Sequence, residues 1–586
     1  MLSTSVSSAA TGYLKHNLVS DQPGVADFTD PNLVNAWGLA TSATSPFWVC
    51  DGGTGLSTVY SASNTPGTAL GTISATKPQV PGAGGSKNGV CTGIIANTAT
   101  TSFLFSTTAA PTPRAASFIF VTEDGTLSSW ANAVDPANAV LIVDNSATAV
   151  YKGLALVATP TPQLYAANFK AGTIDVFDAT YKPVTLAAGA FTDPGVPADF
   201  APFNIWNLGG KLYVAYAKQD AAKKFDAPGV GNGYISIFDA SGKLLQHFAE
   251  KGLLNSPWGV AIAPASFGKY ANDVLVGNFG DGLINAYDPT TGAYAGTLQD
   301  ASGANIVIPG LWALLLGNGG NGGDRDSVYF TAGPGGQKHG LLGSIQANPV
   351  VASTAVVNAA QTAGAIAANT FVTIKGNSLA ATKRSWAATD FAGGKLNSSL
   401  DGVSVTFNGT PGYISFISPA QINVLTPTDM ANGPVSVVIT NNGLASTAVN
   451  VTGAPVGPAF FLINSDKYVA ATHADGRVIG PTTLIANVTT PVKPGETIVL
   501  YANGLGVTLP AVANGALVTT AIPLAATPTV TVGGMTATVS YAGLSASGLY
   551  QINVVVPAGL SDGDAAVVVQ VSGASSPSGA LITVQN

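Results

Sequence analysis

Two short motifs recur six times each within the first 350 residues, and this repetition limits the fold more than any other feature. One motif is a glycine followed by an alternating apolar strand, and its copies begin at Gly55, Gly125, Gly172, Gly233, Gly282 and Gly340. The other precedes it, and its matching positions, 52–60 residues apart, are Gly38, Gly93, Gly153, Asn207, Gly259 and Ala313. A turn glycine followed by period-2 alternation is typical of a β-hairpin.

Six units of this length, each with an early strand and a later hairpin, predict a six-bladed β-propeller over residues 12–346. A β-sandwich would not give so regular a period, and a parallel β-helix would need a much shorter one. The segment 13–19 precedes the first unit and is expected to supply the outer strand of the last blade, which closes the ring. Residues 1–11, mostly Ser, Ala and Thr, are expected to form a flexible N-terminal segment.

A different unit is duplicated in the remaining residues. Asn377 and Asn503 lie 126 residues apart in matching strands, and Gln421 and Gln551 lie 130 residues apart in matching Gln-Ile-Asn-Val runs. Short alternating strands joined by Asn-Gly and Gly-Gly turns favour immunoglobulin-like sandwiches, here at residues 347–455 and 456–586. The chain is therefore predicted to be all-β, with a six-bladed β-propeller followed by two immunoglobulin-like β-sandwich domains.

Composition narrows the functions that such a fold could serve. Charged residues make up 9% of the 586 residues, against about 25% in ordinary globular proteins. The apolar fraction of 46% argues against disorder. The net charge of −7 argues against a nucleic-acid binder, because such proteins usually carry a basic face. The sequence contains no run of about 18 apolar residues that could span a membrane.

The cellular compartment has two interpretations. The given chain shows no signal peptide, because no charged segment followed by an apolar core stands at its start. It is therefore either a cytosolic protein or a mature exported one, extracellular or periplasmic, and the neutral composition rich in Thr, Ser, Asn and Gly favours export. Cys50 and Cys91 are compatible with one disulfide, and inner strands of neighbouring blades approach closely enough to form it.

The residues also carry two family resemblances. Through segments 35–39, 317–324 and 329–333, residues 12 to about 346 resemble an uncharacterised family of exported bacterial six-bladed propellers, similar to NHL and YncE-type propellers. Through the two Gln-Ile-Asn-Val copies and the run 494–497, residues from about 350 to 586 resemble the C-terminal region of secreted acidobacterial-type proteins, which is related to TIG/IPT immunoglobulin-like folds. Both resemblances imply a fold and an external location, and neither supplies a catalytic residue.

Standard catalytic strings are missing, and the remaining metal candidate is a glycine-rich loop. The chain has no Gly-x-Ser-x-Gly elbow, no His-Glu-x-x-His and no phosphate-cradling loop with a lysine. Residues 319–324 fit the Gly-Gly-x-Gly-x-Asp string of calcium-binding β-rolls, although such repeats bind calcium only when stacked. The loop is either a tight turn at the channel mouth or a calcium site that uses Asp324, Asp326 and backbone carbonyls. Calcium is the only cofactor that the sequence suggests.

The start of each early strand is the candidate ligand site, because these strands line the central channel of a propeller. Four of the seven tryptophans lie at this repeat phase, and Lys152 shares it. They either pack between blades or form an aromatic, amide-lined funnel, which suits a neutral ligand better than a phosphate. The candidate ligand-binding residues are Asn35, Trp37, Asn204, Trp206, Trp258 and Trp312.

Two classes of function follow. The first is an exported, non-catalytic binding or scaffold protein, whose propeller presents a face to a neutral glycan, a small molecule or a cell-surface protein, with the sandwiches as spacers or adhesion domains. The second is a propeller enzyme, a lactonase, hydrolase or lyase, with or without a metal. It would need carboxylates clustered at the channel mouth, for which the candidates are Asp51, Asp124, Asp281 and Asp324. The missing catalytic strings and the scarcity of ionisable residues favour the first class.

Overall fold

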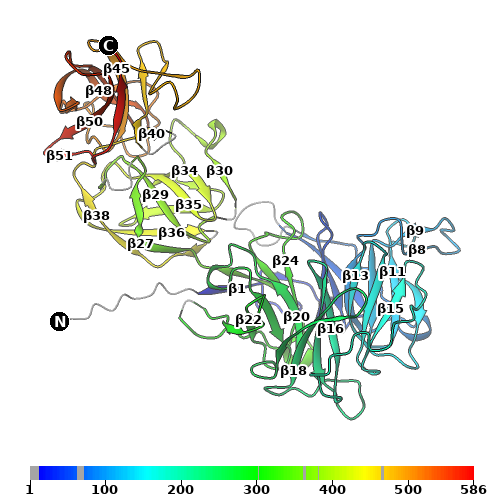
Figure 1. Ribbon diagram of the computed structural model, residues 1–586. Helices are drawn as coiled ribbons and strands as arrows, with labels where there is room; N and C mark the ends of the chain where they lie inside the picture. Colours follow the sequence, from blue (N-terminus) through cyan, green and yellow to red (C-terminus); the bar gives the residue numbers. More distant parts are fainter. Residues whose placement is uncertain are drawn as a thin grey trace, which may run out of the picture. The chain divides into compact units, whose positions relative to one another are not determined.

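A computed structural model describes residues 12–62, 72–300, 302–360, 365–380, 382–441, 443–463 and 467–586. The segment 1–11, predicted to be flexible, lies outside these residues. The chain divides into two compact units, one that extends to Asn348 and one that begins at Pro349 (Figure 1). Described helical elements are short: α1 (Pro334–Gln337) and 3-10 turns at Ala83–Gly85, Gly268–Tyr270 and Ala388–Asp390. None of the described helices has the length and apolar character needed to cross a membrane.

The first unit is a ring of six sheets, here called blades 1 to 6. Blade 1 contains β3 (Ala36–Ala40), β4 (Phe47–Asp51), β5 (Leu56–Ser61) and β6 (Thr72–Ile73). Blade 2 contains β7 (Cys91–Ala96), β10 (Phe118–Thr122), β11 (Thr126–Trp130) and β12 (Val140–Asp144), with a small hairpin of β8 (Leu104–Phe105) and β9 (Arg114–Ala115). Blade 3 contains β13 (Tyr151–Val157), β14 (Gln163–Asn168) and β15 (Thr173–Asp178).

The other three blades follow in chain order. Blade 4 contains β16 (Phe200–Leu208), β17 (Lys211–Lys218), β18 (Gly233–Phe238) and β19 (Leu244–Glu250). Blade 5 contains β20 (Pro257–Ile262), β21 (Val274–Asn278), β22 (Ile284–Tyr287) and β23 (Tyr294–Thr297). Blade 6 contains β24 (Leu311–Leu316), β25 (Val328–Ala332), β26 (Leu341–Ala347), β1 (Tyr13–Ser20) and β2 (Phe28–Thr29).

The strand β1 closes the ring. It pairs antiparallel with β26, from Tyr13 opposite Ala347 to Ser20 opposite Leu341, so blade 6 joins the first and last strands of the unit. Each innermost strand contacts the innermost strand of the next blade, and β24 contacts β3. The predicted six-bladed propeller is thus confirmed, together with the closing role of segment 13–19.

A β-bulge interrupts each innermost strand near its start. The extra residues are Trp37, Thr92, Lys152, Phe203, Trp258 and Trp312, one from each blade. A bulge bends the strand and redirects its side chain. The residue after the bulge packs on the next inner strand: a Cβ on Gly38 would lie 2.8 Å from the carbonyl oxygen of Thr92. This close approach explains why glycine follows four of these six positions.

The repeat phase predicted for blade 4 was wrong. The sequence aligns Trp206 with the other tryptophans, but the bulge of β16 falls on Phe203, between Pro202 and Asn204. Trp206 lies three residues further along the same strand, which is longer than the other inner strands. The two strand segments have similar patterns, and only the pairing with β17 distinguishes them.

The second unit contains two sandwiches, each with its own apolar core. In the first, one sheet has the order β27 (Val350–Asn358), β29 (Phe371–Asn377), β35 (Gln421–Leu425), β34 (Tyr413–Ser418) and β30 (Arg384–Ser385). The facing sheet has the order β28 (Ile366–Ala367), β38 (Val449–Ala454), β36 (Gly433–Asn441), β32 (Val403–Phe407) and β31 (Ser399–Leu400), with β33 (Thr410–Pro411) and β37 (Leu444–Ala445) at its side.

The two layers of the second sandwich are continuous, because the 12-residue strand β48 (Met535–Ala546) pairs with both β47 and β49. One layer holds β40 (Leu462–Ile463), β41 (Tyr468–Val469), β52 (Leu581–Val584), β50 (Gly563–Val571) and β47 (Thr529–Val532), with β51 (Ala574–Ser575). The other holds β49 (Leu549–Val555), β45 (Thr497–Asn503), β42 (Ala471–His473), β43 (Val478–Ile479) and β44 (Thr489–Thr490), with β39 (Ala459–Phe460) and β46 (Ile522–Pro523).

Two buried asparagines join the sandwiches. Asn503 donates from Nδ2 to Asn358 Oδ1 at 2.9 Å and to the carbonyl of Phe371 at 2.8 Å, and its Oδ1 accepts the Phe371 N–H. Asn358 in turn donates to the carbonyls of Gly457 and Ala365. We call this group the asparagine junction. Every polar atom of both side chains has a partner, as the low dielectric of a buried site requires.

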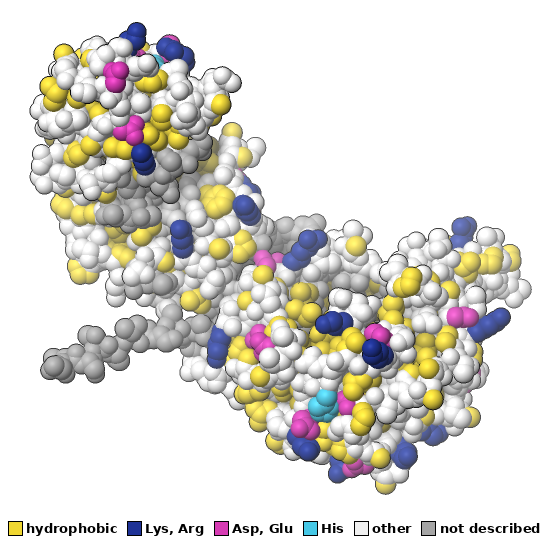
Figure 2. Space-filling model, in the orientation of Figure 1, with side chains coloured by type: hydrophobic (Ala, Val, Ile, Leu, Met, Phe, Trp, Pro, Cys, Tyr) yellow, Lys and Arg dark blue, Asp and Glu magenta, His cyan; other side chains and the backbone are white. Residues whose placement is uncertain are grey.

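Charged side chains are spread over the visible face of the molecule, singly or in small mixed groups (Figure 2). This matches a chain in which 9% of residues are charged.

Candidate functional site

The bulge residues of different blades meet at the centre of the propeller, where they form what we call the hub. Trp37 and Trp312 stack with ring centroids 3.7 Å apart, and Trp312 also lies 5.9 Å from Phe203 and from Trp258. The Nε1 of Trp258 donates to the carbonyl of Lys152 at 2.9 Å. Residues from blades 1, 3, 4, 5 and 6 are therefore in direct contact across the channel.

The predicted funnel tryptophans mostly pack against one another. Trp37, Trp258 and Trp312 are 1–2% exposed, so their faces are covered. Trp206 is half-buried and donates to the carbonyl of Trp258 at 3.3 Å. The packing alternative thus describes the three buried tryptophans, because six inner strands converge on an axis that has room for only a few rings.

The two predicted amides hold this packing in place. Asn35 is 4% exposed, and its Oδ1 accepts the indole N–H of Trp312 at 3.0 Å. Asn204 is 1% exposed and donates to the carbonyl of Trp258 at 3.0 Å. Their polar atoms are used inside the protein, so these amides act as supports for the hub.

A buried ion pair lies beside the tryptophans. The Lys152 ammonium, on a side chain that is 2% exposed, contacts the carboxylate of Glu123. It also lies 5.2 Å from the ring centroid of Trp37, 5.8 Å from that of Phe169 and 5.3 Å from that of Phe225. Aromatic faces attract a cation, so the ammonium is held by one carboxylate and a cage of rings. Burial lowers the pKa of Lys152, and the Glu123 carboxylate opposes that shift.

Glu123 reaches the hub from a position that recurs in every blade. The residue that follows the second strand donates its N–H to the segment before the inner strand: Glu123 to Val90, Phe169 to Val150, and Phe279 to Ser256. These side chains form a second layer on the hub, in which Phe279 stacks on Trp312 at 4.0 Å. Blades 1 and 6 have Gly52 and Gly333 at this position, and the Asn35 side chain fills the space beside them: a Cβ on Gly333 would lie 2.3 Å from Asn35 Oδ1.

The loop between β17 and β18 covers the ion pair. Its tip is closed by a bridge between Gln219 and Asp226 and by the N–H of Asp220, which donates to the carbonyl of Phe225. Gln219 also donates from its side chain to the carbonyl of Phe169. Phe225, 48% exposed, places its ring over the Lys152 ammonium. Phe225 thus covers the buried Lys152 ammonium with an aromatic ring that is itself half-exposed.

Three buried polar atoms around Lys152 have no hydrogen-bond partner: Trp37 Nε1, Asp226 Oδ2 and Ser256 Oγ. The Ser256 side chain is 0% exposed and lies beside Asp226, without meeting normal hydrogen-bond geometry. Burial raises the pKa of Asp226, opposed by Ser256 and by the Lys152 charge. An unpartnered buried polar group costs about 1–3 kcal/mol, so three in one place need an explanation.

The other predicted site residues lie elsewhere. The Asp324 carboxylate accepts the N–H of Asp326 and the hydroxyl of Ser327, and the Asp326 carboxylate accepts the hydroxyl of Ser266. Burial raises the pKa of both aspartates. The side chain of Asn318, which the sequence analysis did not single out, shapes this loop by accepting two loop N–H groups and donating to the carbonyls of Ser42 and Ser45.

The cysteines and the candidate carboxylates belong to separate parts of the ring. Cys50 on β4 and Cys91 on β7 form a disulfide between blades 1 and 2, with Cα atoms 5.4 Å apart. Asp51, Asp124 and Asp281 lie at strand ends or turns in three different blades and accept hydrogen bonds from neighbouring residues. Within the residues that the structure describes, no group of three or more His, Cys, Asp or Glu side chains is placed to hold a metal ion.

Sequence reasoning missed Glu123, Asp226, Ser256 and the phenylalanines of the hub. One signal was available for Glu123, because it is one of only three glutamates in the chain and follows an apolar strand. Asp226 and Phe225 lie in a loop outside the repeat, so their approach to Lys152 depends on the closed ring.

Comparison with known proteins places the chain among viral relatives. Uncharacterized protein R648 of Acanthamoeba polyphaga mimivirus is 33% identical over 350 residues, which are 58% of this chain and 82% of the viral protein. Uncharacterized protein L690 of the same virus is 32% identical over 347 residues, 57% of this chain and 86% of that protein. The chain belongs to the family of these two proteins. Both of these relatives are viral, so they do not support the bacterial origin that the sequence resemblance implied.

Two further comparisons concern the fold. Residues 355–453 match the IPT/TIG domain, which confirms the predicted TIG/IPT resemblance for the first sandwich. Virginiamycin B lyase from Staphylococcus aureus has 8% identity and a TM-score of 0.31, covering 57% of this chain and 99% of the lyase. PQQ-bound aldose sugar dehydrogenase from Streptomyces coelicolor has 12% identity and a TM-score of 0.33, covering 58% of this chain and all of that chain. Scores this low carry no conclusion about this family.

Proposed function

We propose that the protein is a non-catalytic binding protein and that the hub takes a neutral, polar small molecule or the end of a glycan. The observation that carries this proposal is the group of unpartnered polar atoms on Trp37, Asp226 and Ser256 beside the Lys152–Glu123 pair. Buried polar groups are nearly always paired. A ligand with hydroxyl groups would accept from the indole N–H and exchange hydrogen bonds with the serine and the carboxyl group.

The charge of the site supports a neutral ligand. The Lys152 ammonium and the Glu123 carboxylate offset each other. The raised pKa of Asp226 favours its uncharged form. The rings of Trp37 and Phe169 lie 5.2 Å and 5.8 Å from the Lys152 ammonium, so a ligand above the ion pair would pack beside aromatic side chains.

The β17–β18 loop supplies a route of entry. Phe225 is the outermost ring over Lys152 and is half-exposed, while the residues below it are buried. A ligand would displace this ring and take its place above the ion pair. The proposal therefore includes an opening of the loop around Phe225.

The test is a calorimetric and fluorescence titration of the full chain with neutral mono- and oligosaccharides and polyols. We expect saturable binding that changes tryptophan emission through Trp37. Ser256→Ala should weaken it about tenfold, which corresponds to one hydrogen bond of about 1.4 kcal/mol. Trp206→Ala is the control, because the Trp206 indole N–H donates to the carbonyl of Trp258 and is not one of the unpartnered atoms. A flat response to the whole panel, or equal affinity in Ser256→Ala, would refute the proposal.

A second candidate function is an enzyme that acts on a carbonyl compound, and the observation that favours it is Lys152 itself. A lysine whose pKa is lowered by burial has more free amine available as a nucleophile. Its amine would add to an aldehyde, release water and form an imine, which borohydride reduces to a stable secondary amine. Peptide mapping after glyceraldehyde and borohydride should then find the adduct on Lys152, faster in Phe225→Ala. Labelling of exposed lysines alone would reject this candidate.

The proposed setting is an exported protein, extracellular or periplasmic. Its support is the Cys50–Cys91 disulfide, since disulfides persist in oxidising compartments. The sandwich domains would act as spacers or as a second binding module. Mass spectrometry of the alkylated native protein tests the location, because two free thiols would contradict it.

A further inference from the structure

Blade 3 lacks the fourth strand that completes the other blades. In the described residues its sheet ends at β15, whereas the others continue to β6, β12, β19, β23 or β1. After β15 the chain turns and forms one bridge, Phe177 to Pro183, in which the Asp178 N–H donates to the carbonyl of Lys182 at 2.9 Å and the Val184 N–H to that of Val176 at 2.8 Å. The preceding residue, Pro183, has no N–H to donate. The chain then leaves the sheet edge on its way to Phe191.

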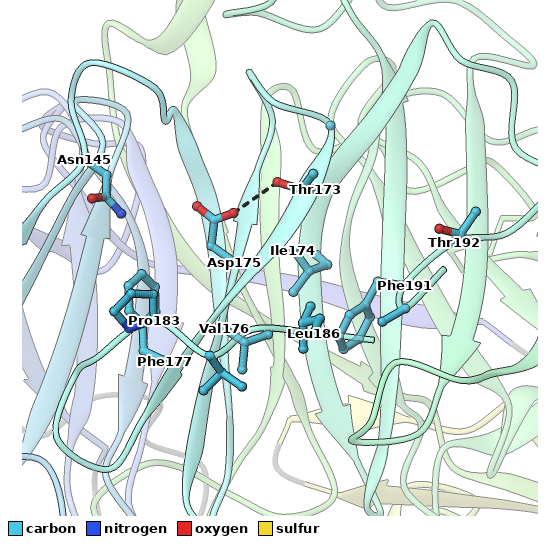
Figure 3. A pocket seen from close by; sticks show the side chains of 13 residues that line it. Asn145, Thr173, Ile174, Asp175, Val176, Phe177, Pro183, Leu186, Phe191 and Thr192 are labelled. Carbon is cyan, nitrogen blue, oxygen red and sulfur yellow. Dashed lines mark hydrogen bonds between the residues drawn. The ribbon is translucent and has the colours of Figure 1, made fainter. Parts of the chain in front are cut away.

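A pocket of about 380 Å³ lies where the missing strand would run. Its wall includes residues from both faces of β15: Ile174 and Val176 point one way, Asp175 and Phe177 the other (Figure 3). Leu186 and Phe191 of the departing segment line its far side. A pocket that touches both faces of one strand is a groove along the edge of that strand.

The groove exposes backbone groups that a strand could pair with. The carbonyl of Val176 faces outward, because it accepts from Val184. Since backbone groups alternate along an antiparallel strand, Ile174 faces the same side, two residues earlier. The structure shows no backbone partner on this side for Ile174 among the described residues. Unpaired edge groups of this kind are a template for an added strand.

The rim of the groove has a defined chemistry. On the side of Leu186 and Phe191 it is apolar, and on the other side it carries Asp175 and Asn145. The Asp175 carboxylate accepts from Tyr151, Asn168 and Thr173, which holds it at the edge of the groove. A strand here would place apolar side chains on the first side and, by charge complementarity, a basic side chain on the second.

We propose that this groove binds an extended peptide segment of a partner protein, which adds a fourth strand to blade 3. Pro183 and Val184 already pair with the end of β15, so the open part of the edge is residues 172–175, with room for a paired segment of about 13 Å at ~3.3 Å per residue. The peptide alternates apolar residues with polar ones and has Lys or Arg opposite Asp175. This site is separate from the hub and does not depend on the function proposed for it.

The test uses a labelled, capped hexapeptide, Thr-Val-Lys-Val-Thr-Val, and the full chain. We expect saturable binding by fluorescence anisotropy and at least about tenfold slower hydrogen exchange at the Ile174 amide, since strand pairing protects it. Peptides with proline or N-methyl groups at the pairing positions should not bind. Replacement of the peptide lysine by glutamate should weaken binding several-fold, as should Asp175→Asn in the protein.

Two protein variants complete the test. Leu186→Arg places a positive charge in the groove, which repels the lysine of the peptide, and should reduce the affinity more than about tenfold. Glu250→Gln, on the outer strand of blade 4, should leave the affinity unchanged. The melting temperature of each variant shows whether blade 3 remains folded. The proposal is overturned if the hexapeptide fails to bind wild-type protein, if it binds without protecting β15, or if the glutamate peptide binds equally well.

Discussion

The hub of the propeller and the asparagine junction of the sandwiches both bury polar side chains, but they treat them differently. At the junction, the amide atoms of Asn358 and Asn503 all have partners at 2.8–3.1 Å. At the hub, atoms of Trp37, Asp226 and Ser256 have none, although they surround a buried ion pair. A fully satisfied polar cluster is what a structural joint needs, and a partly satisfied one marks a place where something else completes the bonding.

The contrast extends to how each region is covered. The junction lies between two domains of one compact unit, and both of its asparagines are 0% exposed. The hub is closed on one side by a loop whose outermost side chain, Phe225, is 48% exposed. The following predictions are ordered from the largest expected effect to the smallest.

Trp312→Ala should produce the largest loss, about 4–5 kcal/mol in the free energy of unfolding of the propeller. Trp312 is 1% exposed, stacks on two rings and donates to Asn35. Scanning calorimetry should show the propeller transition shifted and the sandwich transition unchanged. Trp206→Ala, at a half-buried position, is the control and should cost about 1 kcal/mol. Similar losses in both variants would mean that the hub is not the packing centre.

Lys152→Met should destabilise the propeller by about 3 kcal/mol, because it leaves the Glu123 carboxylate buried without a counter-charge. The double variant Lys152→Met with Glu123→Leu should regain most of that loss, since apolar side chains can replace a buried ion pair. Urea unfolding of the three proteins measures this. If the double variant is no more stable than the single one, the pair contributes by geometry rather than by charge.

Asn503→Leu should destabilise the sandwich unit by about 2–3 kcal/mol, because it leaves the Phe371 N–H unpaired and removes one of the two hydrogen bonds at the Phe371 carbonyl and at Asn358 Oδ1. Here, unlike at the hub, the double variant with Asn358→Leu should not recover stability, since the orphaned carbonyls belong to the backbone. Asn553→Ala, half-buried on a neighbouring strand, should change stability by less than about 0.5 kcal/mol. Recovery in the double variant would remove the distinction between the two clusters.

Asp226→Asn should have the smallest effect and a characteristic pH dependence. Burial raises the pKa of Asp226 in the folded chain, so the folded state binds this proton more tightly than the unfolded state does. Wild-type stability should therefore fall as pH rises from the ordinary aspartate value, about 3.9, through the raised folded value. The asparagine variant should lack this slope and be up to about 1 kcal/mol more stable at pH 7. The free energy of unfolding of both proteins is measured with urea from pH 4 to 7. The same dependence on pH in both would contradict a raised pKa at Asp226.

Much of the architecture follows from local sequence. The period of 52–60 residues predicts the six blades, because each turn glycine and each alternating strand is a local choice of the backbone. Segment 13–19 and the two sandwiches can also be recognised from the sequence, because their alternating apolar residues follow the pattern of paired β-strands. The tryptophans at the bulges were correctly grouped for blades 1, 5 and 6, where glycine or alanine follows them.

The tertiary structure alone determines the chemistry of the hub. Lys152 and Glu123 are 29 residues apart, and Asp226 lies 74 residues beyond Lys152. They meet because ring closure brings inner strands and loops of different blades onto one axis, and no local pattern records such a contact. The same holds for Phe203, whose place at the bulge depends on its pairing with β17, and for the open edge of blade 3, where a single bridge between Phe177 and Pro183 replaces a strand. Sequence periodicity determines which strands form, whereas the burial of a charge and the exposure of an edge depend on what the neighbouring blades cover.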